Sequence, residues 1–168
     1  MEYNQPSEIV KHLSFGIDAR EKIMHGVDKL TNAVKSTLGA SGKCVIYEDA
    51  LGKPVITKDG VTVAESVVLY DPVENIGATL IKEAARNTVK EAGDGTTTAT
   101  VLAHSLLQTV EKTKYGSLRE VKDGIKSGTN KVIKYLEKKA KAVNDSLLTD
   151  VSTISTNNDK ELGEIISQ

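Results

Sequence analysis

The chain has 168 residues, which fits one ordinary domain or one domain with part of a second. Its 22 basic and 23 acidic residues nearly cancel, so bulk charge gives no drive towards nucleic acid or an acidic membrane surface. The single Cys44 cannot form an intrachain disulfide, and no apolar run is long enough to span a membrane. We therefore expect a protein of a reducing compartment, the cytoplasm, without a nucleic-acid or membrane partner.

An amphipathic helix is predicted over residues 18–38, with Asp18 as its N-cap and Gly39 as its stop. Its apolar side chains recur every three or four residues and therefore share one face, the pattern of a helix packed against a core. Aromatic residues make up only 4% of the chain and tryptophan is absent, so that core must be aliphatic. The apolar positions are Ile23, Val27, Leu30, Val34 and Leu38.

A short β-hairpin is predicted next. The β-branched run at residues 43–47 and a returning strand at 54–57 flank a turn at 49–52. An isolated hairpin is only marginally stable in water, so we expect its edges to pair with another strand. An N-terminal segment of the chain or a neighbouring subunit could supply that strand.

Three glycine-containing turns carry polar side chains, at residues 37–42, 58–60 and 93–95. The second, Lys58-Asp59-Gly60, would be interpreted as an ordinary turn if it stood alone. Its occurrence with two similar turns in a short fold supports another interpretation, in which the three turns converge on one ligand.

The helix that starts after Asp71 has the clearest signals. Asp71 suits the N-cap, Pro72 the first helical position and Glu74 the third position of a capping box. The helix should end near residue 92 and lead directly into the third turn, while the small residues Gly77 and Ala78 would let another helix approach closely. The predicted buried face comprises Ile76, Leu80, Ile81, Ala84, Ala85 and Thr88.

Residues 93–100 read Gly-Asp-Gly-Thr-Thr-Thr-Ala-Thr. The glycines let successive N–H groups face one concavity, and the start of the following helix adds unpaired N–H groups and the positive end of a dipole. Asp94 would repel a phosphate unless a cation such as Mg²⁺ lies between them, so the pattern favours a phosphate site that carries a metal ion. A glycine turn with a threonine N-cap is the alternative, and the spacing excludes a Walker A loop. The apolar positions of the following helix are Val101, Leu102, Leu106 and Val110.

The C-terminal part begins with a helix predicted from Ser117, where Ser117 and Glu120 match a capping box. The basic run at 134–141 is interpreted as a solvated helix face, because no basic stripe elsewhere supports nucleic-acid binding. Residues 143–146 resemble a linker, and 158–161 could start a last helix. The sequence stops early in that helix, so we expect a truncated chain or a piece of a larger protein.

Several of these segments resemble, in the same order, the N-terminal third of a group I chaperonin of the GroEL type. The resemblance runs from about Phe15 to the C-terminus, and the motif at residues 93–100 is its most specific part. The matching segments are residues 15–20, 37–39, 56–63, 74–78, 93–102 and 153–155.

This resemblance implies a mostly α fold: a helical equatorial (ATP-binding) chaperonin domain with a small β-hairpin, incomplete in this chain. Residues 1–140 would form the N-terminal part of the equatorial domain, and residues 141–168 the start of the intermediate domain. It also implies an ATPase whose identical subunits form rings that fold unfolded client polypeptides, with a co-chaperonin lid as a further partner. ATP, Mg²⁺ and K⁺ are the implied cofactors.

The resemblance also assigns roles to residues. In the family, the turn at 37–40 contacts the nucleotide and the segment at 94–98 wraps the phosphates. Asp59 matches the residue that lies near the γ-phosphate and supports hydrolysis, and it is the implied catalytic residue. The implied nucleotide-binding residues are Thr37, Leu38, Gly39, Ala40, Lys58, Asp94, Gly95, Thr96, Thr97 and Thr98.

The implied metal ligands are Asp94 for Mg²⁺ and, for K⁺, the main-chain carbonyls of Thr37 and Lys58 with the hydroxyl of Thr97. Ala40 stands where the family usually has proline, and the next residue, Ser41, where a lysine is common. The loss of proline should make that loop less rigid.

The apical domain, the base and ribose contacts and the family's main catalytic aspartate lie outside the matched segments. The isolated chain should therefore lack half of its nucleotide pocket. The alternative function is a truncated, chaperonin-derived structural or assembly module without ATPase activity.

Overall fold

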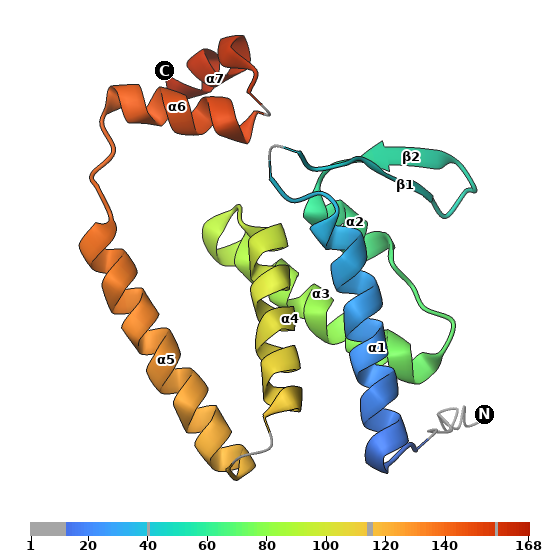
Figure 1. Ribbon diagram of the computed structural model, residues 1–168. Coiled ribbons are helices and arrows are strands. Elements are labelled where there is room, and N and C mark those ends of the chain that lie inside the picture. The colour runs from blue at the N-terminus through green and yellow to red at the C-terminus, as the bar shows by residue number, and fades with distance from the viewer. Residues whose placement is uncertain (1–12, 40, 114–115, 157) are drawn as a thin grey trace, which may run out of the picture. The chain divides into compact units, whose positions relative to one another are not determined.

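The computed structural model describes residues 13–39, 41–113, 116–156 and 158–168 (Figure 1). The chain forms two compact units, Met1–Lys114 and Tyr115–Gln168. A mostly α-helical fold with a small β-hairpin was expected, and the elements confirm it. No helix in the described part of the chain combines the length and the apolar character needed to cross a membrane. The first unit contains α1 (Gly16–Lys35), β1 (Val45–Glu48), β2 (Pro54–Thr57), α2 (Gly60–Ser66), α3 (Pro72–Ala92) and α4 (Thr96–Lys112), and the second contains α5 (Leu118–Lys139), α6 (Asp145–Ser155) and α7 (Lys160–Ser167).

Helix α1 is shifted relative to the prediction. Phe15 occupies the N-cap with extended backbone, and Asp18 lies in the first turn, where its charge still complements the helix dipole. The helix ends at Lys35, and the amide of Thr37 donates to the carbonyl of Val34 at 3.0 Å. The chain therefore leaves the helix before Thr37, which places this predicted site residue in a tight turn.

Helices α1 and α3 cross each other (Figure 1), and two glycines, one on each helix, lie where they meet. A Cβ atom placed on Gly26 would lie 1.8 Å from the carbonyl oxygen of Glu74. A Cβ atom on Gly77 would lie 2.0 Å from the carbonyl oxygen of Ile23. Each glycine thus lets the backbone of the other helix come within contact, as the small residues Gly77 and Ala78 had suggested.

Ion pairs flank this crossing. The carboxylate of Glu74 accepts hydrogen bonds from Nδ1 of His25 and Nζ of Lys29, both at 2.7 Å. One turn away, Nζ of Lys22 donates to Asp71 at 3.0 Å. Glu74 was predicted to close a capping box with Asp71, but its side chain turns towards α1 instead and holds the two helices in register.

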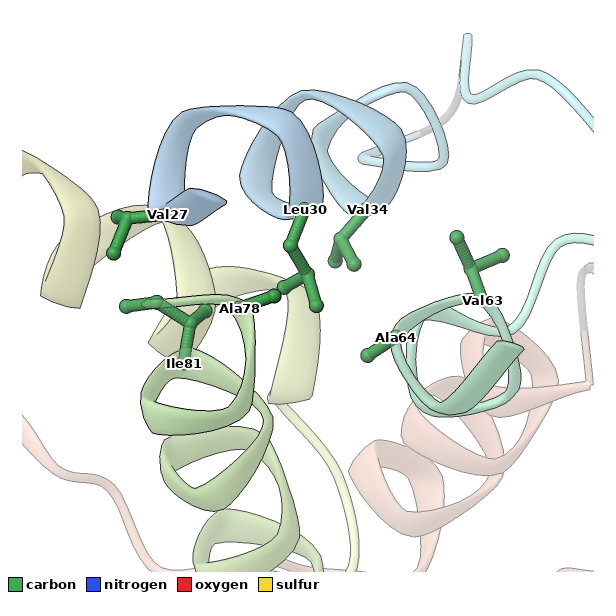
Figure 2. Packing of buried hydrophobic residues seen from close by; sticks show 7 residues of the cluster. All are labelled: Val27, Leu30, Val34, Val63, Ala64, Ala78 and Ile81. Carbon is green, nitrogen blue, oxygen red and sulfur yellow. The ribbon is translucent and has the colours of Figure 1, made fainter. Parts of the chain in front are cut away.

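The core of the first unit is small and aliphatic, as the composition required. Figure 2 shows side chains of α1 facing side chains of α2 and α3. Leu30 and Val34 of α1 are fully buried, and so is Val63 of α2. The short helix α2 is therefore an integral part of the core. The cluster comprises Val27, Leu30, Val34, Val63, Ala64, Ala78 and Ile81.

The buried face of α3 differs from the prediction. Ile76 and Leu80 are 55% and 59% exposed, although both were expected to be buried. The close approach to α1 is possible only along the glycine side of α3, so Gly77 and its neighbours face the core and the two larger side chains turn away. The buried residues of α3 are Val73, Gly77, Ala78, Ile81, Lys82 and Ala85.

The hairpin follows the predicted pattern. Strands β1 and β2 pair antiparallel, with Ile46 opposite Ile56, and Gly52 has a φ of 75° in the connecting turn. The Asp49 carboxylate closes this turn by accepting the main-chain N–H groups of Leu51 and Lys53. Ile46 and Ile56 are 68% and 67% exposed, so one face of the hairpin presents apolar side chains.

In the second unit, α5 starts at the predicted capping box of Ser117 and Glu120, and none of its residues is buried within the described chain. Residues 143–146 were interpreted as a linker, but α6 already begins at Asp145, because the side chain of Asn144 caps it by accepting the amide of Leu147. Helix α7 packs on α6, where a Cβ atom on Gly163 would lie 2.4 Å from the hydroxyl oxygen of Thr153.

Candidate functional site

The turn between α3 and α4 has two glycines in the left-handed region. Gly93 is the C-cap of α3 with φ 75°, and Gly95 is the N-cap of α4 with φ 88°. Such backbone is easily adopted only by glycine. Asp94 lies between them and is exposed, and its Oδ1 accepts the main-chain N–H of Gly95 at 2.5 Å. The two helices therefore meet in a tight turn that presents a single carboxylate to solvent.

The N-terminus of α4 has no side-chain cap, because its N-cap residue is Gly95. The first helical hydrogen bond of the ladder runs from the amide of Ala99 to the carbonyl of Gly95 at 2.9 Å, so the amides of Thr96, Thr97 and Thr98 precede it. The alternative interpretation, a threonine N-cap, is wrong. In the same unit, Asp59 and Asp71 cap α2 and α3 with their carboxylates.

The three threonines differ in their surroundings. Thr96 is buried, Thr97 is half-buried and Thr98 is exposed. Thr100, one turn further on, is fully buried and donates its hydroxyl to the carbonyl of Thr96 at 2.9 Å. The first turn of α4 is thus anchored on one side, while its uncapped end faces the glycine turn.

Asp59 is both exposed and fixed in place. Its carboxylate accepts the amides of Val61 at 3.3 Å and Thr62 at 2.8 Å, and the hydroxyl of Thr62 at 2.5 Å. Partial burial acts to raise the pKa of Asp59, but the hydrogen bonds from Thr62 and Val61 outweigh it and hold the pKa below its usual range. The group is therefore a charged, oriented carboxylate at neutral pH.

Three of the predicted segments meet around Gly60. A Cβ atom placed on Gly60 would lie 2.2 Å from Oγ1 of Thr97 and 3.4 Å from Cγ1 of Val34. Val34 in turn accepts the hydroxyl of Thr37 through its carbonyl, at 2.8 Å. The structure therefore brings together the end of α1, the start of α2 and the start of α4.

The turn after α1 is compact. A Cβ atom on Gly42 would lie 2.2 Å from the carbonyl oxygen of Thr37, and the amide of Lys43 donates to the carbonyl of Ser36 at 2.8 Å. Thr37 is buried, whereas Leu38 and Gly39 are exposed. Ala40, also a predicted site residue, lies outside the described residues.

The residues of the site suit the proposed metals in kind. Mg²⁺ is usually bound through one or two carboxylates together with substrate phosphates and water, and Asp94 supplies such a carboxylate beside the uncapped helix. The described residues contain no group of three or more His, Cys, Asp or Glu side chains that could hold a metal by themselves. Lys58 is exposed and directly precedes Asp59, and its predicted part in a K⁺ site involves only its main-chain carbonyl.

The family of the chain follows from comparison with known proteins. Residues 30–168 match the TCP-1/cpn60 chaperonin family. The chain belongs to this family. It is also similar in structure to the chaperonin gp146 from the bacteriophage EL 2 (Pseudomonas aeruginosa), crystallised in the presence of ATP-BeFx. Crystal form II gives a TM-score of 0.80 at 33% identity over 90% of this chain and 27% of that one. Crystal form I gives 0.80 at 32% identity over 90% of this chain and 28% of the other.

These matches confirm the expected fold, the N-terminal equatorial region of a chaperonin. The chain spans 27% or 28% of the length of the gp146 chains that it matches. Sequence reasoning missed helix α2, although aspartate, here Asp59, is a preferred residue at a helix N-cap. It also missed Thr62 as the residue that fixes Asp59, and Gly42 as the residue that packs on Thr37.

Proposed function

We propose that this chain is the N-terminal ATP-binding part of a chaperonin subunit that binds and hydrolyses Mg-ATP to drive the ring conformational changes that fold client proteins. The observation that carries the proposal is the uncapped start of α4 behind Gly93 and Gly95, packed through Thr97 against Gly60 of α2. The gp146 chaperonin was crystallised with an ATP analogue, and its similarity over 90% of this chain supports the same class of ligand.

In this proposal the start of α4 binds the phosphates. The main-chain N–H groups of Thr96, Thr97 and Thr98 and the positive end of the helix dipole would face the phosphate oxygens, and the exposed Thr98 hydroxyl would add a further donor. Asp94 would hold Mg²⁺, which when bound neutralises charge on the phosphates. Its position in a turn between two packed helices keeps that carboxylate in one place.

Asp59 is the proposed catalytic residue. Phosphoryl transfer depends mainly on positioning and charge stabilisation. One oriented carboxylate near the γ-phosphate would help to position the attacking water. The hydrogen bonds from Thr62 and Val61 keep Asp59 charged. Its carboxylate would then accept a hydrogen bond from the O–H of an attacking water. Because Asp59 also caps α2, its direction is set by the helix that it begins.

Residues 37–40 would contact the nucleotide from the end of α1. The carbonyls of Thr37 and Lys58 and the hydroxyl of Thr97 are proposed to hold K⁺. The contact between Gly60 and the Thr97 hydroxyl supports this grouping, because it joins α4 to the segment that contains Lys58. Carbonyl and hydroxyl oxygens are ligands of the kind that hard cations prefer.

The activity of the whole protein is part of the same proposal. Identical subunits in a ring, unfolded client polypeptides and a co-chaperonin lid are the proposed partners, and the cytoplasm is the proposed location. Residues 1–140 are proposed to belong to the equatorial domain and residues 141–168 to the start of the intermediate domain. Family membership supports each of these points in general terms.

A chaperonin-derived structural or assembly module without ATPase activity is the second candidate. Leu102 and Leu106 of α4 are 59% and 48% exposed, and none of the residues of α5 is buried within the described chain. These apolar side chains favour a segment that acts by packing against further polypeptide.

Calorimetric titration with Mg-ATP and a turnover assay, both on the complete subunit, test the proposal. Asp94→Ala should lower Mg-dependent binding or hydrolysis by about two orders of magnitude. Asp123→Ala, on the exposed surface of α5, is the control and should leave both unchanged. Unchanged hydrolysis in Asp94→Ala would contradict the metal role. A complete subunit that binds no nucleotide would contradict the ATPase and favour the module.

A further inference from the structure

Helix α2 links the proposed hydrolysis residue to the rest of the fold. It has only seven residues, too few to be stable alone, and it begins with Asp59 at the N-cap and Gly60 in its first turn. Val63 and Ala64 bury its apolar side against α1 and α3 (Figure 2). At its start, α2 is also limited by the close contact of Gly60 with Thr97. Apolar burial itself is non-directional, so polar contacts at the far end of α2 would further define its rotation and its position along its axis. Because Asp59 is hydrogen-bonded to the first turn of α2, such contacts would also fix Asp59.

The far end of α2 receives one such contact from a buried lysine. Lys82 of α3 is only 8% exposed, and its Nζ donates to the main-chain carbonyl of Glu65 at 3.2 Å. This carbonyl belongs to the last turn of α2, where carbonyls lack helical partners and a cation complements the dipole. Burial lowers the pKa of Lys82, while the nearby Glu65 charge opposes that shift. Lysines are rarely buried to this degree without a specific partner.

A second contact fixes the side chain of the same residue. Arg86, one turn further along α3, donates from Nε to Oε1 of Glu65 at 2.5 Å and from Nη2 to Oε2 at 2.6 Å. Both side chains are exposed, but a two-pronged guanidinium–carboxylate pair constrains direction as well as distance. Glu65 is therefore held by its main chain and by its side chain, from two positions on one face of α3.

The same helix also leads to the metal turn. Helix α3 runs from Lys82 and Arg86 without interruption to Ala92, and Gly93 caps it directly before Asp94. Gly93 lies seven positions after Arg86, about two helical turns. Helix α3 thus carries the two residues that hold Glu65, Lys82 and Arg86, which we call the clamp on α2. It also leads into the turn that presents Asp94, so α3 connects the positions of the Asp59 and Asp94 carboxylates.

We propose that Lys82 and Arg86 are positioning residues of the nucleotide site. By holding the carbonyl and the carboxylate of Glu65, they fix the rotation and axial position of α2 relative to α3, and so the position of Asp59 relative to Asp94. This inference rests on the proposed ATPase function, but the clamp itself can be tested without it.

The test uses the complete subunit and four variants. Arg86→Gln removes the two-pronged pair, and Lys82→Met removes the buried ammonium while keeping most of the volume. The double variant Glu65→Arg with Arg86→Glu reverses the pair and is the rescue. Arg20→Gln changes an exposed arginine on α1, outside the site, and is the control. Amide hydrogen exchange of α2 is measured alongside kcat and KM for Mg-ATP.

Arg86→Gln and Lys82→Met should each speed exchange of the α2 amides about tenfold, with little change in α1 and α4. Both should lower kcat about 10- to 100-fold while KM changes less than about twofold, because Asp59 moves while the phosphate ligands on α4 stay in place. The reversed pair should recover most of the lost kcat, and Arg20→Gln should match the wild type. A role in stability alone would leave kcat of the folded fraction unchanged.

Two results would overturn the inference. In the first, the α2 amides of Arg86→Gln and Lys82→Met exchange at the same rate as those of Arg20→Gln. Lys82 and Arg86 would then not hold α2 in place, whether or not the protein hydrolyses ATP. In the second, the α2 amides exchange faster but kcat is unchanged. Lys82 and Arg86 would then hold α2 without positioning Asp59 for hydrolysis. Absence of turnover in the unaltered subunit, with faster α2 exchange in the variants, would instead contradict the ATPase proposal and retain the clamp.

Discussion

Gly60 lies directly against Thr97, so that a Cβ atom on the glycine would stand 2.2 Å from the threonine hydroxyl oxygen. The contact joins the segment that holds Lys58 and Asp59 to the helix that follows the Gly-Asp-Gly turn. These segments are far apart in the sequence, and Lys58-Asp59-Gly60 alone would be interpreted as an ordinary turn. Their contact supports the proposal that they share one ligand site.

Gly60→Ala should destabilise the first unit, because the new methyl group overlaps Oγ1 of Thr97. Overpacking of this kind costs about 1–3 kcal/mol in free energy of unfolding. Adding Thr97→Ala removes Oγ1 and leaves the nearest threonine atom, Cβ, at 3.4 Å, a tight but tolerable contact. The double variant should therefore recover most of the loss. Urea unfolding of both single variants and the double variant measures the coupling, and strict additivity would contradict it.

Asp59→Asn should lower kcat for ATP hydrolysis by about 10²- to 10⁴-fold in the complete subunit while nucleotide affinity changes little. Asparagine is as good an N-cap as aspartate, so α2 should persist and the loss reports the charge. Asp71→Asn is the matched control, because Asp71 caps α3 in the same way through the amides of Val73 and Glu74. Equal losses in the two variants, or loss of binding with normal turnover of bound nucleotide, would refute the assigned role.

The link between α1 and α3 through Glu74 predicts a pH dependence of stability. Hydrogen bonds from Lys29 and then His25 hold the pKa of Glu74 below its ordinary value of 4.5. A lowered folded-state pKa contributes stability above pH 4.5, and this contribution is lost as the pH falls through the lower folded-state value. The stability difference between wild type and Glu74→Gln should therefore be largest near neutral pH and shrink under acid conditions.

Glu91→Gln, at the exposed end of the same helix, is the control for this experiment. Its effect on the midpoint of unfolding should be small and nearly constant with pH. A stability difference for Glu74→Gln that grows as the pH falls below 4.5 would contradict the ion-pair assignment.

The features that local chemistry specifies were predictable from the sequence. Asp71 with Pro72 gave the start of α3, and Ser117 with Glu120 gave the start of α5, because each cap is a hydrogen bond between neighbours. The same holds for the Gly-Asp-Gly turn, whose left-handed glycines end one helix and begin the next. Helix α2 was missed because only seven residues carry its pattern, and burial of Val63 and Ala64 stabilises it.

Features that depend on packing between helices were less predictable. Ile76 and Leu80 fit an apolar stripe by spacing, yet the reciprocal glycine contact with α1 decides which side of α3 is buried. The clamp on Glu65 has no local signal either, because Lys82 and Arg86 lie 17 and 21 residues away along the chain. The spacing of apolar residues shows that a helix has an apolar side. Which part of that side is buried depends on where the backbone of a second helix comes closest, here that of α1 against α3.

The reciprocal glycines at the crossing of α1 and α3 give the last prediction. In an open helix, Gly→Ala is favourable by about 1 kcal/mol because alanine is the better helix former. At Gly77 the new methyl group would meet the carbonyl oxygen of Ile23 at 2.0 Å, and a backbone atom cannot rotate away. We expect the clash to outweigh propensity, so that Gly77→Ala lowers the free energy of unfolding by about 1–3 kcal/mol.

Gly124→Ala is the matched control, because a Cβ atom at that position in α5 has no atom within 4 Å. It should leave the first unit unchanged and slightly raise helicity by circular dichroism. Equal or greater stability of Gly77→Ala in urea unfolding would show that the two helices can separate without cost, and the close crossing would be refuted.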